Sequence, residues 1–155
     1  MLITHQKSAP RRQRGFSLVE VLIALVIMSV GMLGIAGLYV QSMQAGRTSM
    51  FRHHAVTLAG DVADRIRANP TALGVYTGGG ADGGCVGLGV SCSQPQMAQH
   101  DIFLWSAQAA EMLPAGTVNV TLDAAVTPPE YTIAVRWVEA GENLDYTIII
   151  PIRGL

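Results

Sequence analysis

A long apolar segment near the N-terminus constrains this chain more than any other feature. No charged residue occurs from Val21 to Gly46, a stretch longer than the about 20 helical residues that cross a bilayer. Glu20 stands directly before this stretch, where an ionised carboxylate in apolar surroundings is costly and usually has a function. The segment therefore predicts a helix that lies in lipid or among other apolar helices, with one functional acid at its start.

The charges are distributed unevenly around this segment. Residues 1–15 carry Lys7, Arg11, Arg12 and Arg14, whereas the rest of the chain carries six arginines and eleven acids. By the positive-inside rule, this bias places the leader in the cytoplasm and the C-terminal part on the other side of the membrane. Without the leader the chain is acidic, which argues against a nucleic-acid partner, since such partners need a basic surface.

Three interpretations of the N-terminus compete. An ordinary secretory signal peptide has a basic start and an apolar core, and Gly34–Ala36 offers small residues for cleavage, but Glu20 and the length of the run oppose it. A plain membrane anchor explains the hydrophobicity and leaves Glu20 without a role. The third interpretation is a specialised signal that is cut between Gly15 and Phe16, ahead of the apolar run.

The residues around this junction support the third interpretation. Gly15, Phe16 and Glu20 follow a basic leader and precede an apolar run, and in this pattern the chain resembles the type IV pilin and pseudopilin family. The resemblance implies that a prepilin peptidase cuts after Gly15 and N-methylates Phe16. It also implies that Glu20 helps each new subunit to assemble with its neighbours.

The spacing of these residues has a physical logic. Cleavage frees the α-amine of Phe16, which then lies about one helical turn from Glu20, the separation at which groups on a helix meet. A positive amine and a carboxylate in a low-dielectric environment neutralise each other, within one subunit or between neighbours.

The segment 41–69 continues the helix with one apolar face. Asp61 and Arg65 are spaced for an i,i+4 ion pair, and Asn69 before Pro70 predicts the end of the helix. His53 and His54 are adjacent, so they point in different directions and do not favour a shared metal ion. The apolar positions recur every three or four residues: Met43, Met50, Phe51, Ala55, Leu58, Ala59, Val62 and Ile66.

The later part of the chain adds a finer resemblance, to the PilV-type minor pilins. The sequence Asp64–Pro70 is similar to the helix end of those proteins. They also tend to have a cysteine-containing loop, then a helix with an Asp and a Trp, then a Leu-Pro turn. The counterparts here are Cys85, Cys92, Asp101, Trp105 and Leu113–Pro114.

The segment from Thr71 to Ser93 is rich in glycine and is expected to be a surface loop. No Lys-Ser or Lys-Thr follows its glycines, which argues against a phosphate-binding loop. Cys85 and Cys92 are favoured as a disulfide over a metal or catalytic site, because no pair of histidines lies near them in the sequence. No cofactor and no metal ion are expected.

A second helix and three strands are predicted after the loop. Ser93–Gln96 reads as a capping box at the start of the helix, whose apolar stripe includes Met97, Ile102, Trp105, Ala109 and Met112, with Asp101 as a helix-face or capping group. Alternating segments at 118–124, 131–137 and 144–152 predict strands, with Pro128–Pro129 and Ala140–Asn143 as turns. The expected fold class is α+β, with the long N-terminal helix packed on a small antiparallel sheet.

These elements predict four parts and a function. The parts are a leader (1–15), a membrane-spanning or fibre-core helix (16–40), an amphipathic continuation (41–69) and a periplasmic head (70–155). No catalytic constellation is present, so we expect a structural protein: a minor pilin of the type IV pilus, with the prepilin peptidase, other minor and major pilins and the inner membrane as partners. The alternatives are a pseudopilin of type II secretion and a single-pass anchored periplasmic binding domain.

Overall fold

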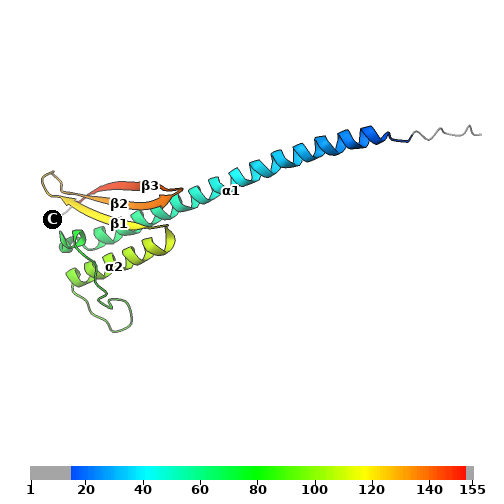
Figure 1. Ribbon diagram of the computed structural model, residues 1–155. Helices are drawn as coiled ribbons and strands as arrows, with labels where there is room; N and C mark the ends of the chain where they lie inside the picture. Colours follow the sequence, from blue (N-terminus) through cyan, green and yellow to red (C-terminus); the bar gives the residue numbers. More distant parts are fainter. Residues whose placement is uncertain (1–14, 153–155) are drawn as a thin grey trace, which may run out of the picture. The chain divides into compact units, whose positions relative to one another are not determined.

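The computed structural model describes residues 15–152, which divide into two compact units between Met43 and Gln44. Helix α1 (Leu18–Ala68) contributes to both units (Figure 1). Residues 1–14 of the predicted leader, which include Lys7, Arg11, Arg12 and Arg14, and the last three residues of the predicted head lie outside the described residues.

The N-terminal unit consists of the first half of α1. Its described side chains are exposed throughout. Within residues 15–152, α1 is the one helix that is long and apolar enough to cross a membrane, as judged by length and composition. The absence of proline between Pro10 and Pro70 allows the backbone hydrogen bonds to continue without a break.

The head begins with the second half of α1 and two short 3₁₀ turns, η1 (Pro70–Ala72) and η2 (Val75–Thr77). The predicted uniform loop over 71–93 is therefore wrong at its start. Tyr76 and Ala72 are buried in these turns, and their burial folds the chain back onto the end of α1.

Helix α2 (Gln94–Met112) starts and ends as the sequence predicts. The backbone N–H of Ser93 donates to Oε1 of Gln96 at 2.9 Å, which is one half of a capping box, and Pro95 occupies the first turn. The chain turns at Leu113–Pro114 and enters the sheet.

The sheet has three antiparallel strands in the order β1 (Thr117–Asp123), β2 (Glu130–Glu139) and β3 (Glu142–Pro151). Val120 pairs with Ile133, and Ile133 pairs with Ile148 in the next strand. These three strands confirm the predicted meander, with Pro151 at the end of an edge strand.

The hairpin between β2 and β3 is tighter than predicted. Ala140 and Gly141 have φ values of 52° and 85°, as a two-residue primed turn requires, and Gly141 adopts its conformation without strain. Glu142 and Asn143, assigned to the turn from the sequence, instead pair with β2 as the first residues of β3.

The core of the head lies between the sheet and both helices, which cover the same face (Figure 1). Trp105 is 1% exposed, as expected of a core anchor, and burying one large apolar side chain contributes about 1.5–3 kcal/mol. The α+β fold class is confirmed. Met43, Met50 and Met112, which were assigned from the sequence to the apolar faces of the two helices, are exposed.

Candidate functional site

The predicted processing site lies in the non-helical residues that precede α1. Gly15, Phe16 and Ser17 are all exposed, and the side chain of Phe16 is 84% exposed. A peptidase acts on a bond that is accessible and outside regular structure. The Gly15–Phe16 bond meets both conditions.

Glu20 is the acid in the first turn of α1. The N–H of Val21 donates to the carbonyl of Ser17 at 3.3 Å. Glu20 therefore lies within the first helical turn, and Phe16 precedes that turn. A carboxylate near a helix N-terminus is stabilised by the helix dipole by about 0.3–1 kcal/mol. No ion pair among residues 15–152 includes Glu20.

The apolar part of α1 also has an open backbone surface. Gly31, Gly34 and Gly37 recur every three residues, and a Cβ added at any of them would meet nothing within 4 Å. Small residues in an apolar helix permit the close approach of a second backbone. This stretch of α1 can therefore pack against a second helix.

A polar cluster in the head was only partly foreseen from the sequence. Arg65 forms the predicted pair with Asp61 at 3.1 Å, and its Nη1 also donates to Oδ1 of Asp101 at 2.7 Å. Asp101 is 3% exposed, so it is a buried structural carboxylate and not the helix-face or capping group expected. Trp105 Nε1 donates to Asp61 at 3.3 Å, which ties α2 to α1 a second time.

Tyr76 completes this cluster from η2. Its hydroxyl donates to Oδ2 of Asp101 at 3.2 Å and accepts from Nδ2 of Asn69 at 3.1 Å, while its ring stacks on Trp105. Burial, reinforced by the negative charge of Asp101, raises the pKa of Tyr76 to about 12. Burial opposes the charge on Arg65, but its hydrogen bond to Asp101 and the charge of Asp61 prevail, so its pKa lies above the ordinary value.

The glycine-rich segment is fastened to α2 and closed by a disulfide. Cys85 and Cys92 are joined, with a Cα–Cα distance of 5.8 Å. Gly80 lies so close to α2 that an added Cβ would sit 2.4 Å from the backbone nitrogen of Phe103. The N–H of Ala81 donates to the carbonyl of Gln99 at 3.1 Å, so the start of this segment follows α2 closely.

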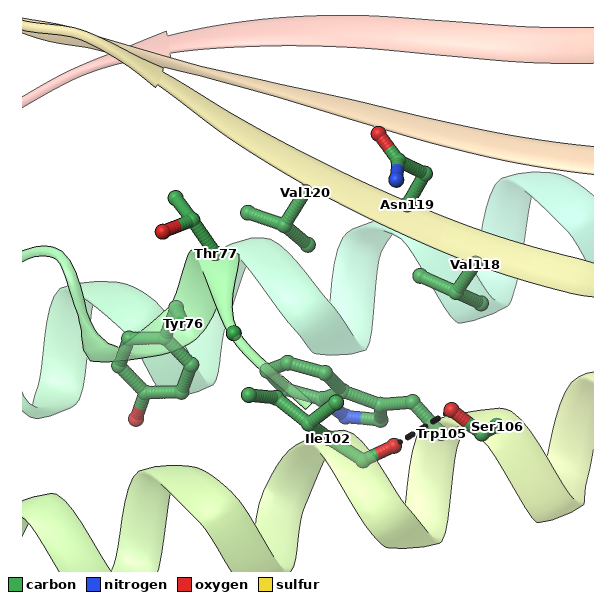
Figure 2. A pocket seen from close by; sticks show the side chains of 9 residues that line it. Tyr76, Thr77, Ile102, Trp105, Ser106, Val118, Asn119 and Val120 are labelled. Atoms are coloured by element: carbon green, nitrogen blue, oxygen red, sulfur yellow. Dashed lines mark hydrogen bonds between the residues drawn. The ribbon is translucent and has the colours of Figure 1, made fainter. Parts of the chain in front are cut away.

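The crevice beside Trp105 is small. It lies between η2, α2 and β1, is lined by residues that include Tyr76, Trp105 and Val120, and has a volume of about 50 Å³ (Figure 2). Pockets for small molecules are about 300–1,000 Å³, so this crevice does not fit a cofactor. No cluster of metal-ligating side chains occurs within 15–152, and the rings of His53 and His54 are 6.3 Å apart.

Comparison with known proteins gives two adjacent matches. Residues 10–36 match the family described as the prokaryotic N-terminal methylation motif, and residues 37–103 match the family described as type IV pilin Tt1218. No curated protein and no solved structure gives a significant match. The first matched range contains Gly15, Phe16 and Glu20, and the second contains the disulfide ring and Asp101.

Proposed function

We propose that this chain works as a minor pilin in the assembly or initiation of a type IV pilus, since residues 10–36 match the N-terminal methylation motif and residues 37–103 match a type IV pilin family. The methylation motif implies processing by a prepilin peptidase and assembly with other pilins. Proteins of this family are structural. The observation that carries the proposal is the exposed Gly15–Phe16 junction, followed at once by α1, which has Glu20 in its first turn and no other charged residue before Arg47.

Processing changes the charge at the start of the helix. Hydrolysis of the Gly15–Phe16 amide leaves a carboxylate on the leader at Gly15 and an amine on Phe16, and N-methylation of that amine preserves its positive charge. The new charge is placed directly before α1, where no basic residue occurs until Arg47.

Glu20 is the partner proposed for this amine. A charged group without a partner in an apolar environment costs several kcal/mol, and a nearby opposite charge offsets much of that cost. In an isolated subunit the pair forms across one turn of α1. In a fibre, an amine on an incoming subunit paired with Glu20 of a neighbour sets the register between the two helices.

The disulfide supports the proposed location of the head. Disulfides persist in oxidising compartments such as the periplasm and are rare in the cytoplasm. With the basic leader in the cytoplasm, residues 16–40 cross the inner membrane and the head is periplasmic. Incorporation into a fibre then moves the whole chain out of the membrane.

The assignment to the PilV type is supported by the way its counterpart residues come together. Asp101 and Trp105 of α2 both bond to side chains of α1, and Cys85 and Cys92 are paired in the segment before α2. A type II secretion pseudopilin shares the N-terminus, and genes for secretion components beside this one would favour that alternative. A single-pass anchored periplasmic binding domain, the other alternative, would keep the leader (1–15) in the mature protein.

Replacement of Glu20 tests the proposal. In Glu20→Ala the peptidase still cuts after Gly15, while the amount of the chain in sheared pili falls, because the Phe16 amine has lost its partner. Immunoblots of membranes and of sheared fibres measure the two quantities. Glu111→Ala, which removes an exposed acid from α2, serves as the control. Normal incorporation of Glu20→Ala would refute the pairing of amine and carboxylate.

A further inference from the structure

Two arginines follow the charge-free stretch of α1. Residues 21–46 span about 39 Å at 1.5 Å per residue, whereas the hydrocarbon core of a bilayer is about 30 Å thick, so the end of this stretch reaches the lipid headgroups. Arg47 is the first charged residue after the stretch, and Arg52 follows in the next turns of the helix. Basic residues on this side of the membrane oppose the orientation that the leader favours. Their position therefore calls for a function.

Both arginines line a groove in the head, between α1 and the strands β2 and β3. The groove has a volume of about 660 Å³, and its α1 wall starts at Gln44, inside the charge-free stretch. Pockets that hold small molecules are about 300–1,000 Å³, so there is room for a polar group of that size. The Cζ atom of Arg47 lies 6.0 Å from the centre of the Phe51 ring, and this contact holds the guanidinium beside the groove.

The opposite wall of the groove is negative. Glu139 ends β2 and Glu142 begins β3, and both residues line the groove. The hydroxyl of Thr48 donates to Oε1 of Glu139, which joins this wall to α1 (Figure 1). The carboxylate of Glu139 is partly buried, whereas Glu142 is exposed. Asp145 adds a third carboxylate in the adjoining hollow, which Arg52 also lines.

These charges are not neutralised by one another. No ion pair among residues 15–152 includes either arginine or any of the three acids. The positive groups belong to α1 and the negative groups to the β2–β3 hairpin, so the two walls have opposite signs. A purely anionic ligand is repelled by the acids, and a purely cationic ligand is repelled by the arginines. A zwitterion places each of its charges against the wall of opposite sign.

We propose that this groove binds the zwitterionic headgroup of phosphatidylethanolamine from the membrane that α1 crosses. The lipid phosphate accepts hydrogen bonds from the guanidinium groups of Arg47 and Arg52, a geometry that arginine favours with phosphate. The lipid ammonium donates to the exposed carboxylate of Glu142. The charge of Glu139 adds to the attraction for the ammonium without direct contact.

A membrane lipid is favoured over a free zwitterion because the groove adjoins the apolar stretch along the chain. Gln44 belongs to both, so a lipid whose tails lie in the bilayer beside α1 has its headgroup near this part of the helix. Such a ligand is already at the site, and its binding costs less freedom than capture from solution. The inference rests on the membrane-crossing of α1 in the proposed function, and it adds a lipid ligand that the function does not require.

The test measures which lipids the full chain retains. The chain is reconstituted in vesicles that contain equal amounts of phosphatidylethanolamine, phosphatidylcholine and phosphatidylglycerol, floated with the vesicles, extracted in mild detergent and analysed by native mass spectrometry. We expect phosphatidylethanolamine to be retained about tenfold over either other lipid, as a hydrogen bond to a charged group predicts. The choline group has no N–H to donate to Glu142, and phosphatidylglycerol has no cation.

Charge-neutralising variants identify the groups that bind. Glu142→Gln should reduce the preference for phosphatidylethanolamine over phosphatidylcholine to less than about twofold, because the partner of the ammonium is lost. Arg52→Gln should lower the retention of phosphatidylethanolamine about tenfold, because a phosphate donor is lost. Arg136→Gln and Glu111→Gln change exposed residues outside the groove and should leave both quantities unchanged.

The outcomes separate this proposal from the proposed function. Equal retention of the three lipids, a preference for phosphatidylglycerol, or an unchanged preference in Glu142→Gln would overturn the headgroup site. When the chain floats with the vesicles in those cases, the membrane helix and the pilin function stand. A chain that does not float with the vesicles would overturn the membrane-crossing of α1 and the headgroup site together.

Discussion

The buried carboxylate of Asp101 provides the most quantitative prediction for the head. It accepts hydrogen bonds from Nη1 of Arg65 at 2.7 Å and from the hydroxyl of Tyr76 at 3.2 Å, and its side chain is 4% exposed. Replacing it with alanine removes both bonds and leaves the Tyr76 hydroxyl with the more distant carbonyl of Arg65, at 3.5 Å, as its acceptor. The head should then be less stable by an amount that follows from these two contacts.

The two contacts contribute different amounts to the free energy of unfolding. The bond from Tyr76 is buried and runs to a charged group, so it contributes about 1.5 kcal/mol. The Arg65 side chain is 43% exposed, so water screens its ion pair, which contributes about 1 kcal/mol. We therefore expect Asp101→Ala to lower the free energy of unfolding by about 2–3 kcal/mol.

Urea unfolding of the full chain in detergent measures this loss through the fluorescence of Trp105 and Trp137, both of which are buried. Asp64→Ala is the matched control, since Asp64 pairs with Arg67 on the exposed surface. This substitution should lower the free energy of unfolding by less than about 0.5 kcal/mol. Equal small losses for both variants would refute the view that Asp101 joins α2 to α1 and η2. A double-mutant cycle with Tyr76→Phe should give a coupling of about 1 kcal/mol between the two side chains.

Two further predictions concern the head. Absorbance of tyrosinate in the folded chain should show a component that titrates near 12 and is lost in Tyr76→Phe. Because the pKa of Tyr76 is raised from 10.0, its contribution to stability is complete below about pH 10 and is lost as the pH rises to 12. If Tyr76→Phe leaves the titration near 12 unchanged, the burial of Tyr76 beside Asp101 is contradicted. The double variant Cys85→Ser with Cys92→Ser should lower the unfolding free energy by up to about 2.5 kcal/mol on the chain-entropy model; two thiols that react in the untreated wild-type chain would instead show that the disulfide is absent.

Sequence patterns predicted the parts of this fold that depend on local spacing. The three- and four-residue repeat predicted the buried face around Leu58 and Val62, and strand alternation predicted the face on which residues such as Ile133 lie. The processing junction was predicted in the same way, because its signal is contiguous, and it stays a prediction. Each of these features lies within a few residues along the chain, so a single sequence is enough to reveal it.

Contacts between distant residues were not predictable in this way. Asp101 lies 36 positions from Arg65, and nothing local shows that its carboxylate is buried against that guanidinium. His100 is 4% exposed for a related reason, since the glycine-rich segment covers it through Asp82. The apolar repeat of α1 also gave no sign that Met50 would be exposed, because the position of the sheet, and not the helix, decides which turns are covered.

The central claim is that Glu20 pairs with the α-amine of Phe16, which exists only after cleavage between Gly15 and Phe16. Intact-mass and N-terminal fragment analysis of the mature chain from its native membrane tests this claim most directly. The account predicts a chain that begins at Phe16 and carries a methyl group on its amine. A mature chain that still begins at Met1, or one cut near Gly37 by an ordinary signal peptidase, would contradict it.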